Sequence, residues 1–253
     1  MNINFAGLDI AGESNTGPVR HHNEDNFLIY APPGGSAVLA AVADGIGGHS
    51  RGEVASYICC RELYNAASKL DSRKWDARFL RETLEYANER IFDFNLKGRR
   101  VKPMGCTIAA AIFTAAEVIC AYAGDSRIYE FHRAPGHKPL RQLSVDHRPE
   151  GYDELQKTGR LLHTSLVSRS LGTAKFLNLD MQTVARMPDA RYMLCSDGLY
   201  NRQPEQLFSG ILGSDDFSAR QAVNQLLRGA LLAGEKDNIT IICAASVPGG
   251  RKE

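Results

Sequence analysis

The chain has 253 residues, of which 43% are hydrophobic, so it is long enough to bury a sizeable core, and we expect one domain. Its 30 basic and 29 acidic residues nearly cancel, which argues against binding to nucleic acid or to an anionic membrane surface. No apolar run approaches the roughly 20 residues of a spanning helix, and the N-terminus lacks a signal-peptide pattern, which predicts a soluble, cytoplasmic protein without membrane insertion.

Short runs rich in Ile, Val and Ala predict strands. In chain order they cover about 7–13, 26–31, 37–43, 107–113, 117–123, 126–131, 191–196 and 239–246. Apolar residues recur at helical spacing over 54–66, 79–94 and 219–231, and the last pattern ends at Gly234. Strands grouped with strands, and helices with helices, indicate an α+β domain whose sheets carry helices on their outer faces. We expect the domain to span 1–248 and residues 249–253 to form a flexible tail.

The cysteines lie mostly inside apolar segments, and none of them forms a Cys-x-x-Cys pair. This pattern favours reduced core residues over a zinc or redox site. The six are Cys59, Cys60, Cys106, Cys120, Cys195 and Cys243.

Acidic residues stand where predicted strands begin or end. Asp44 follows the apolar run 37–43 and precedes glycines that permit a tight turn and close backbone approach. Comparable positions are held by Asp125, Asp197 and Asp237. A type II turn or a capping aspartate explains one such corner equally well, but the recurrence favours carboxylates delivered to a common cleft.

Residues 20–26 place a guanidinium, two imidazoles and two carboxylates directly before a predicted strand. A solvated charged loop is the alternative explanation. Oxygen ligands from several strand ends, without cysteine, are what Mg²⁺ or Mn²⁺ prefers. Carboxylates gathered this densely would raise one another's pKa values if they were buried without cations. The candidate ligands are Glu24, Asp25, Asp44, Asp197 and Asp237.

Eight segments together resemble the bacterial form of the metal-dependent PPM, or PP2C-type, protein serine/threonine phosphatases. They are TGPVRHHNEDNF, VADGIGGHSRGEVAS, MGCTIAAA, AYAGDSRIY, QLSVDH, VSRSLG, LCSDGL and EKDNITIIC. The similarity runs nearly end to end and keeps the family's order. It implies a four-layer αββα sandwich, with two central antiparallel β-sheets flanked by paired helices.

The resemblance also implies a centre for two Mn²⁺ or Mg²⁺ ions. In it, Asp44 bridges the ions and the carbonyl of Gly45 binds one of them. Asp197 and Asp237 complete the coordination of the other ion. The acidic pair Glu24–Asp25 contacts the second metal directly or holds its waters.

The implied reaction is direct attack of a metal-bridging water on a phosphoserine or phosphothreonine, without a phosphoenzyme. Arg20 matches the phosphate-binding position, where a planar fork grips two oxygens and a lysine is a poor substitute. The chain offers no Cys-x5-Arg loop and no Gly-x-Ser-x-Gly motif for covalent catalysis. The implied partners are phosphorylated proteins, either a cognate Ser/Thr kinase or its substrates, and we expect a monomer.

Some positions depart from the family pattern. Ile46 stands where some members have a histidine, and His49 follows three residues later as a general-acid candidate, with helix capping or packing as the alternative. Asp125 matches a residue linked to a third metal, whereas the usual acidic partner is replaced by Asn201, a weaker, neutral ligand. Any third metal is therefore expected to bind weakly.

The segment between Asp146-His147 and Ser168-Arg169 is shorter than the corresponding flap of a typical bacterial member. A short flap leaves the site more open and suggests an unusual protein substrate. Five residues are candidates to line this approach, with a solvated loop face as the alternative for each. They are His147, Arg148, Lys157, Arg160 and His163.

Two other functions fit the same fold. The chain could be a catalytically silent module that binds phosphoproteins, or a sporulation-type phosphatase acting on an anti-sigma-factor antagonist. The presence of Asp44, Asp197 and Asp237 together with Arg20 favours an active enzyme of the general Ser/Thr branch.

Overall fold

Two antiparallel sheets form the centre of the protein. The computed structural model describes residues 2–5, 7–47, 51–98, 103–132, 139–150 and 167–246. One sheet has the order β1 (Asn2–Phe5), β2 (Leu8–Asn15), β13 (Ile239–Ser246), β12 (Arg191–Cys195), β9 (Arg127–Phe131) and β10 (Leu140–Gln142). The other has the order β11 (Asp180–Ala185), β8 (Glu117–Ala123), β7 (Ile108–Phe113), β4 (Val38–Ala43) and β3 (Asn26–Tyr30). A short pair, β5 (Gly45–Ile46) and β6 (Gly105–Cys106), lies beside them.

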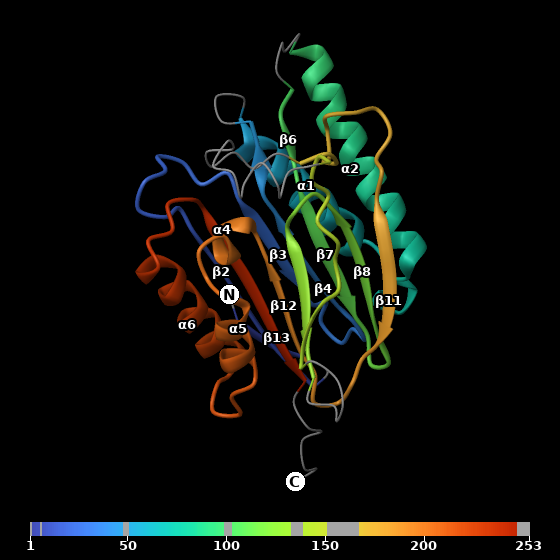
Figure 1. Ribbon diagram of the computed structural model, residues 1–253. Helices are drawn as coiled ribbons and strands as arrows, with labels where there is room; N and C mark the ends of the chain where they lie inside the picture. Colours follow the sequence, from blue (N-terminus) through green and yellow to red (C-terminus); the bar gives the residue numbers. More distant parts are fainter. Residues whose placement is uncertain are drawn as a thin grey trace.

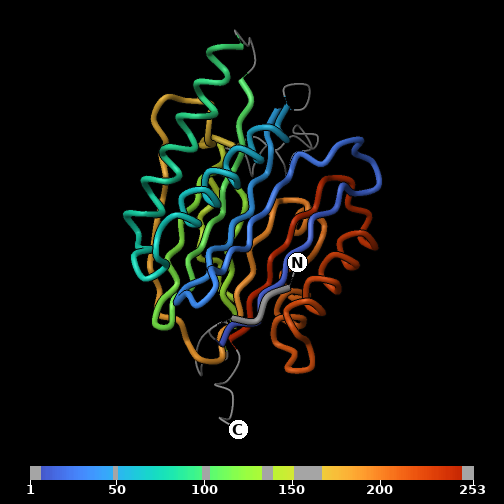
Figure 2. Tube along the Cα trace, turned by 180° about the vertical axis from the view of Figure 1, so that it is seen from behind, coloured from blue at the N-terminus to red at the C-terminus, as the bar shows by residue number. Residues whose placement is uncertain are grey.

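Helices cover the outer face of each sheet (Figure 1). On one side lie α1 (Gly52–Ala67) and α2 (Ala77–Lys97), joined through a 3₁₀ turn at Ser72–Lys74. On the other side lie α5 (Glu205–Leu212) and α6 (Ala219–Leu232), with the single turn α4 (Asp197–Tyr200) directly after β12. The view from behind shows the same two helical layers on opposite sides of the strands (Figure 2). No helix within the described ranges has both the length and the apolar character needed to cross a membrane.

The core is built in three layers because apolar strands are covered on both faces. In β7, Ile108, Ala110 and Ile112 pack toward α1 and α2. The alternate residues Ala109 and Ala111 pack toward the other sheet, as the two-residue period of a strand requires. A third apolar layer joins β12 and β13 to α5 and α6. The αββα sandwich predicted from the sequence is thereby confirmed.

Local signals set where the helices begin. The Asp76 side chain accepts a hydrogen bond from the Phe79 amide at the start of α2. Ser218 and Gln221 form a capping box at the start of α6. All six cysteines are buried and free, as the sequence predicted.

The start of α1 packs tightly on the turn between β4 and β5. A Cβ atom on Gly45 would collide with the main chain of Gly52 and with the carbonyl of Glu24. Only glycine therefore allows this approach, which places the first turn of α1 against the corner that carries Asp44.

Candidate metal centre

The acidic residues singled out in the sequence come from the ends of strands in both sheets. Asp44 lies between β4 and β5, and Asp25 lies directly before β3. Asp125 lies in the turn between β8 and β9, and Asp197 is the first residue of α4. Asp237 precedes β13. The centre is therefore assembled where the two sheets meet, from segments far apart in the sequence.

Thr107 fixes the turn that carries Asp44. Its hydroxyl accepts a hydrogen bond from the Asp44 amide at 3.1 Å, and its own amide donates to the Asp44 carbonyl at 2.8 Å. The same hydroxyl lies 2.6 Å from that of Ser126, next to Asp125. Thr107 thus couples the Asp44 corner to the β8–β9 turn.

Asn238 holds the loop that carries Arg20 and Glu24. It is 5% exposed, and its side-chain oxygen accepts from the Glu24 amide at 2.9 Å. Its side-chain nitrogen donates to the carbonyls of Thr16 and His22 at 2.8 and 3.1 Å. Sequence reasoning did not single out Asn238 or Thr107 as site residues. The Asp-Asn pair within EKDNITIIC was the available signal for Asn238.

Three of the carboxylates are deeply buried: Asp25 is 5% exposed, Asp125 2% and Asp197 4%. One oxygen of Asp25, Oδ2, accepts a hydrogen bond from the Ser196 hydroxyl at 2.7 Å. The other, Oδ1, is buried and has no hydrogen-bond partner among the residues that the structure describes. A carboxylate oxygen in that state is costly unless a cation satisfies it.

These carboxylates lie close enough to repel one another. Burial, followed by repulsion from Asp25, Asp197 and Asp125, holds the pKa of Asp44 well above its usual range. Burial also raises the pKa of Asp25 to about 7 against the hydrogen bond from Ser196, and the charges of Asp197 and Asp237 add to the increase. The pKa of Asp125 is raised to about 7 by burial and then by Asp197. The centre thus concentrates negative charge that a cation would stabilise.

Arg20 lies at the rim of this centre. Its guanidinium donates to Asp237 Oδ2 at 2.6 Å, and the two side chains are 47% and 26% exposed. Burial, followed by repulsion from Glu53, raises the pKa of the nearby Glu24. The structure therefore brings Arg20 to the acidic centre while leaving its guanidinium half accessible to a ligand.

The donor set fits hard divalent cations. In the part of the chain that the structure describes, no three His, Cys, Asp or Glu side chains are grouped so as to hold one ion by themselves. Mg²⁺ usually keeps several waters and takes only one or two protein carboxylates, so such a closed cage is not required. The unpartnered Asp25 Oδ1 and the all-oxygen composition of the centre agree with that mode of binding.

Some of the residues named from the sequence lie outside the described ranges, and others are more buried than predicted. His49 lies outside the described residues, as do Lys157, Arg160 and His163. His147 is 6% exposed, and the Arg148 side chain is 16% exposed. The solvated loop face is therefore wrong for these two residues, which pack inward. Asn201 is exposed, and its main-chain amide donates to the main-chain carbonyl of Asp197 at 3.0 Å.

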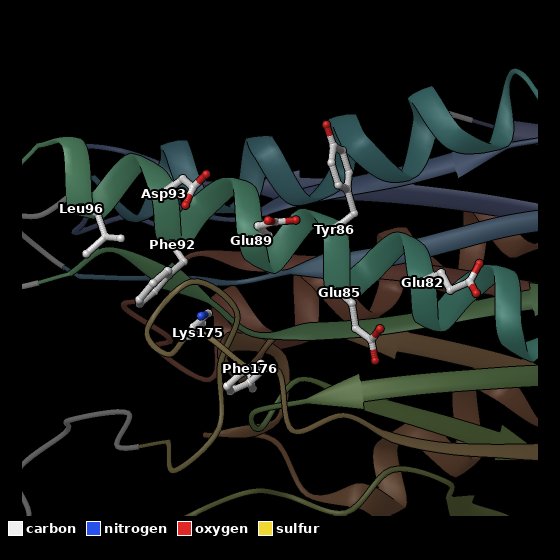
Figure 3. Close-up of a pocket in the computed structure, with 9 residues that line it drawn as sticks. All are labelled: Glu82, Glu85, Tyr86, Glu89, Phe92, Asp93, Leu96, Lys175 and Phe176. Carbon is white, nitrogen blue, oxygen red and sulfur yellow. The ribbon is translucent and has the colours of Figure 1, made fainter.

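A separate groove of 680 Å³ lies outside the carboxylate centre, between α2 and the loop before β11. Figure 3 shows its acidic and aromatic side chains along α2, with Lys175 and Phe176 on the facing loop. The remaining lining residues are Glu82, Glu85, Tyr86, Glu89, Phe92, Asp93 and Leu96. The groove contains none of the predicted metal ligands.

The fold and the acidic centre together define the class of metal-dependent phosphatases built on an αββα sandwich. The family model described as protein phosphatase 2C matches residues 19–239. The chain therefore belongs to the protein phosphatase 2C family, which confirms the resemblance and the enzyme class predicted from the sequence.

Relatives and solved structures agree with this assignment. A serine/threonine phosphatase of Listeria monocytogenes is 32% identical over 237 residues, covering 89% of this chain and 91% of that protein. The crystal structure of the Mycobacterium tuberculosis serine/threonine phosphatase PstP/Ppp superposes with a TM-score of 0.77 at 28% identity, covering 94% of this chain and 98% of that one. A structure of the PstP catalytic domain in complex with two manganese ions gives a TM-score of 0.73 at 28% identity, covering 94% of this chain and 97% of that one.

Proposed function

We propose that this protein is a cytoplasmic, metal-dependent phosphatase that hydrolyses phosphoserine and phosphothreonine in proteins phosphorylated by a cognate Ser/Thr kinase. The alternative substrate is the phosphorylated kinase itself. We further propose that residues 1–248 act as one domain and that the protein is a monomer. The observation that carries the proposal is the buried carboxylate centre with its unpartnered Asp25 Oδ1, beside the accessible guanidinium of Arg20.

The residues divide into metal ligands and a substrate clamp. Asp44 would lie between two Mn²⁺ or Mg²⁺ ions, with the Gly45 carbonyl on one of them and Asp197 and Asp237 on the other. Glu24 and Asp25 would contact the second ion or hold its waters. When bound, such ions supply Lewis acidity that activates water and offsets the negative charge of the phosphoryl group.

Arg20 would bind the substrate phosphate. Its ion pair with Asp237 holds the guanidinium at the acidic rim, and its exposure allows it to turn toward an incoming phosphate. Its planar fork can donate two parallel hydrogen bonds to phosphate oxygens. The candidate general acid His49 stays a prediction from the sequence.

The cysteines support direct hydrolysis over covalent catalysis. Thiolates are the reactive form of cysteine. Burial raises the pKa of Cys120 to about 12, with a further increase from Glu130. Burial also raises the pKa of Cys243 to about 12. The remaining four cysteines are buried as well. A cysteine nucleophile is therefore disfavoured, which supports attack by water.

The test is hydrolysis of a phosphothreonine peptide and of p-nitrophenyl phosphate with Mn²⁺, with Mg²⁺ and with a chelator. We expect metal-dependent turnover in the wild type and its loss in Asp44→Ala. Phe176→Ala, in the groove of Figure 3, is the matched control and should leave the hydrolysis of p-nitrophenyl phosphate unchanged. A folded wild-type protein that binds the phosphopeptide without turnover would instead make it a recognition module.

A further inference from the structure

The buried carboxylate of Asp125 has a protein cation beside it. Asp125 is 2% exposed, and Arg148 Nε lies 3.8 Å from its Oδ2, within ion-pair distance. Family resemblance makes Asp125 a candidate ligand for a third metal ion. A buried carboxylate needs a compensating positive charge, and here Arg148 already supplies it.

Arg148 is held in place by two further contacts. Its terminal nitrogen lies 3.2 Å from Asp146 Oδ2 and donates to the Tyr200 hydroxyl at 3.1 Å. That hydroxyl donates in turn to the main-chain carbonyl of Asp125 at 2.7 Å. The Arg148 side chain is only 16% exposed. The guanidinium is thus tied to Asp125 at both the side chain and the main chain.

A second guanidinium lies next to this contact. Arg127 binds Asp146 through two nitrogens, at 2.9 and 2.8 Å, and its guanidinium lies 3.5 Å above the centre of the Tyr200 ring. Two guanidinium groups, Arg127 and Arg148, therefore face Asp125 and Asp146, while Asp197 is a third carboxylate close enough to repel Asp125. A divalent ion at Asp125 would lie beside the Arg148 charge and be repelled by it. Asn201 adds no negative charge to offset that repulsion.

We infer that Arg148 takes the place of a third metal ion at Asp125, so that this phosphatase binds two ions. An acidic residue at position 201, together with the absence of an arginine at position 148, would allow three. The inference rests on the proposed function, because it presupposes the two-ion centre. In this inference Arg148 is a positioning residue, because it holds the side chains of Asp125 and Tyr200 and has no assigned contact with the substrate.

The test counts bound ions directly. Purified protein is equilibrated with Mn²⁺, and free Mn²⁺ is measured by electron paramagnetic resonance, independently of activity. We expect two ions per chain in the wild type, in Arg148→Lys, which keeps the charge, and in Asn201→Asp, which keeps the arginine. We expect three ions in the double variant Arg148→Gln/Asn201→Asp.

Thermal unfolding separates a cation role from a merely structural one. Arg148→Gln should have a lower midpoint than the wild type in chelator, because Asp125 loses its partner, and Mn²⁺ should raise that midpoint by more than it raises the wild type's. Three ions in the wild type, or two ions in a folded double variant, would overturn the inference while leaving the phosphatase proposal intact. A wild type that binds no Mn²⁺ would remove both.

Discussion

Asp25 is the residue at which burial and charge conflict most directly. Its pKa is raised to about 7, chiefly by burial, whereas an unfolded aspartate titrates near 3.8. Between these two values the folded protein binds more protons at Asp25 than the unfolded chain does. In the absence of metal, its contribution to the free energy of unfolding therefore falls as the pH rises from about 4 to about 7.

This contribution can be isolated with Asp25→Asn, which removes the charge and keeps the shape. In chelator at about pH 7.5, the variant should melt at a higher temperature than the wild type, and the difference should shrink as the pH is lowered toward about 5. Added Mn²⁺ should stabilise the wild type more than the variant, because the ion uses the same carboxylate. Equal midpoints of the two proteins at every pH would contradict the raised pKa.

Arg20 permits a second prediction. Arg20→Lys keeps the charge but loses the fork, so we expect the KM for p-nitrophenyl phosphate to rise about tenfold or more, the equivalent of one charge-assisted hydrogen bond. The kcat should change less, because the residue is assigned to substrate capture. His21→Ala, from the same loop, is the matched control. A larger loss in kcat than in KM would assign Arg20 a role in the chemical step.

The structure brings together the charged residues that the sequence singled out, but the sequence did not single out the neutral residues that position them. Asp44 and Asp197 follow apolar strands, so their place at a strand end is visible in the pattern. Thr107 and Asn238 act through hydrogen bonds to main-chain groups of distant segments. Such contacts depend on which loops meet in space, which the spacing of residues along one chain does not contain.

At the scale of elements, two buried side chains fix α2 to the loop before β11: Asn95 donates to the Gly172 carbonyl at 2.9 Å, and Asn88 makes the larger set of contacts. Asn88 is 2% exposed, accepts a hydrogen bond from the Gly172 amide at 2.7 Å and donates to the carbonyls of Ala174 and Lys175 at 3.2 Å. Replacing it with alanine leaves the buried Gly172 amide without a partner.

We therefore expect Asn88→Ala to lower the free energy of unfolding by about 2–3 kcal/mol. Asn65→Ala on α1 is the control, because Asn65 is only partly buried, its side-chain hydrogen bond to Glu62 is a long contact of 3.4 Å, and alanine favours a helix. Urea denaturation measures both variants. Equal losses in the two would show that the loop is not held by Asn88.

The long, strongly patterned elements were predictable, and the short ones were not. The predicted strands 117–123 and 239–246 agree with β8 and β13 to the residue. The edge strand β11 was missed because its six residues are partly or fully exposed and carry few apolar side chains. The pair β5–β6 was missed because each strand has only two residues and exists through its partner. Tertiary contact, which sequence periodicity does not report, creates such elements.

At the scale of the whole molecule, the two sheets share one apolar layer. Val42 of β4 and Ala111 of β7 belong to the same cluster as Leu194 of β12 and Ile242 of β13. Separating the sheets would expose this layer, and it would also pull apart the carboxylate centre, whose residues come from the ends of strands in both. The stability of the fold and the integrity of the site are therefore coupled.

This coupling predicts that residues 1–248 unfold as one unit, although chains above about 150 residues often unfold in steps. Trp75, the single tryptophan, is 3% exposed and lies in the layer of α1 and α2, so its fluorescence reports that side alone. Far-UV circular dichroism reports all the elements. The transitions seen by the two probes should coincide in chelator and also in Mn²⁺. Both should occur at a higher urea concentration when Mn²⁺ is present. A tryptophan transition that precedes the loss of ellipticity would show that the helical layers unfold separately, and the single-domain proposal would then be wrong.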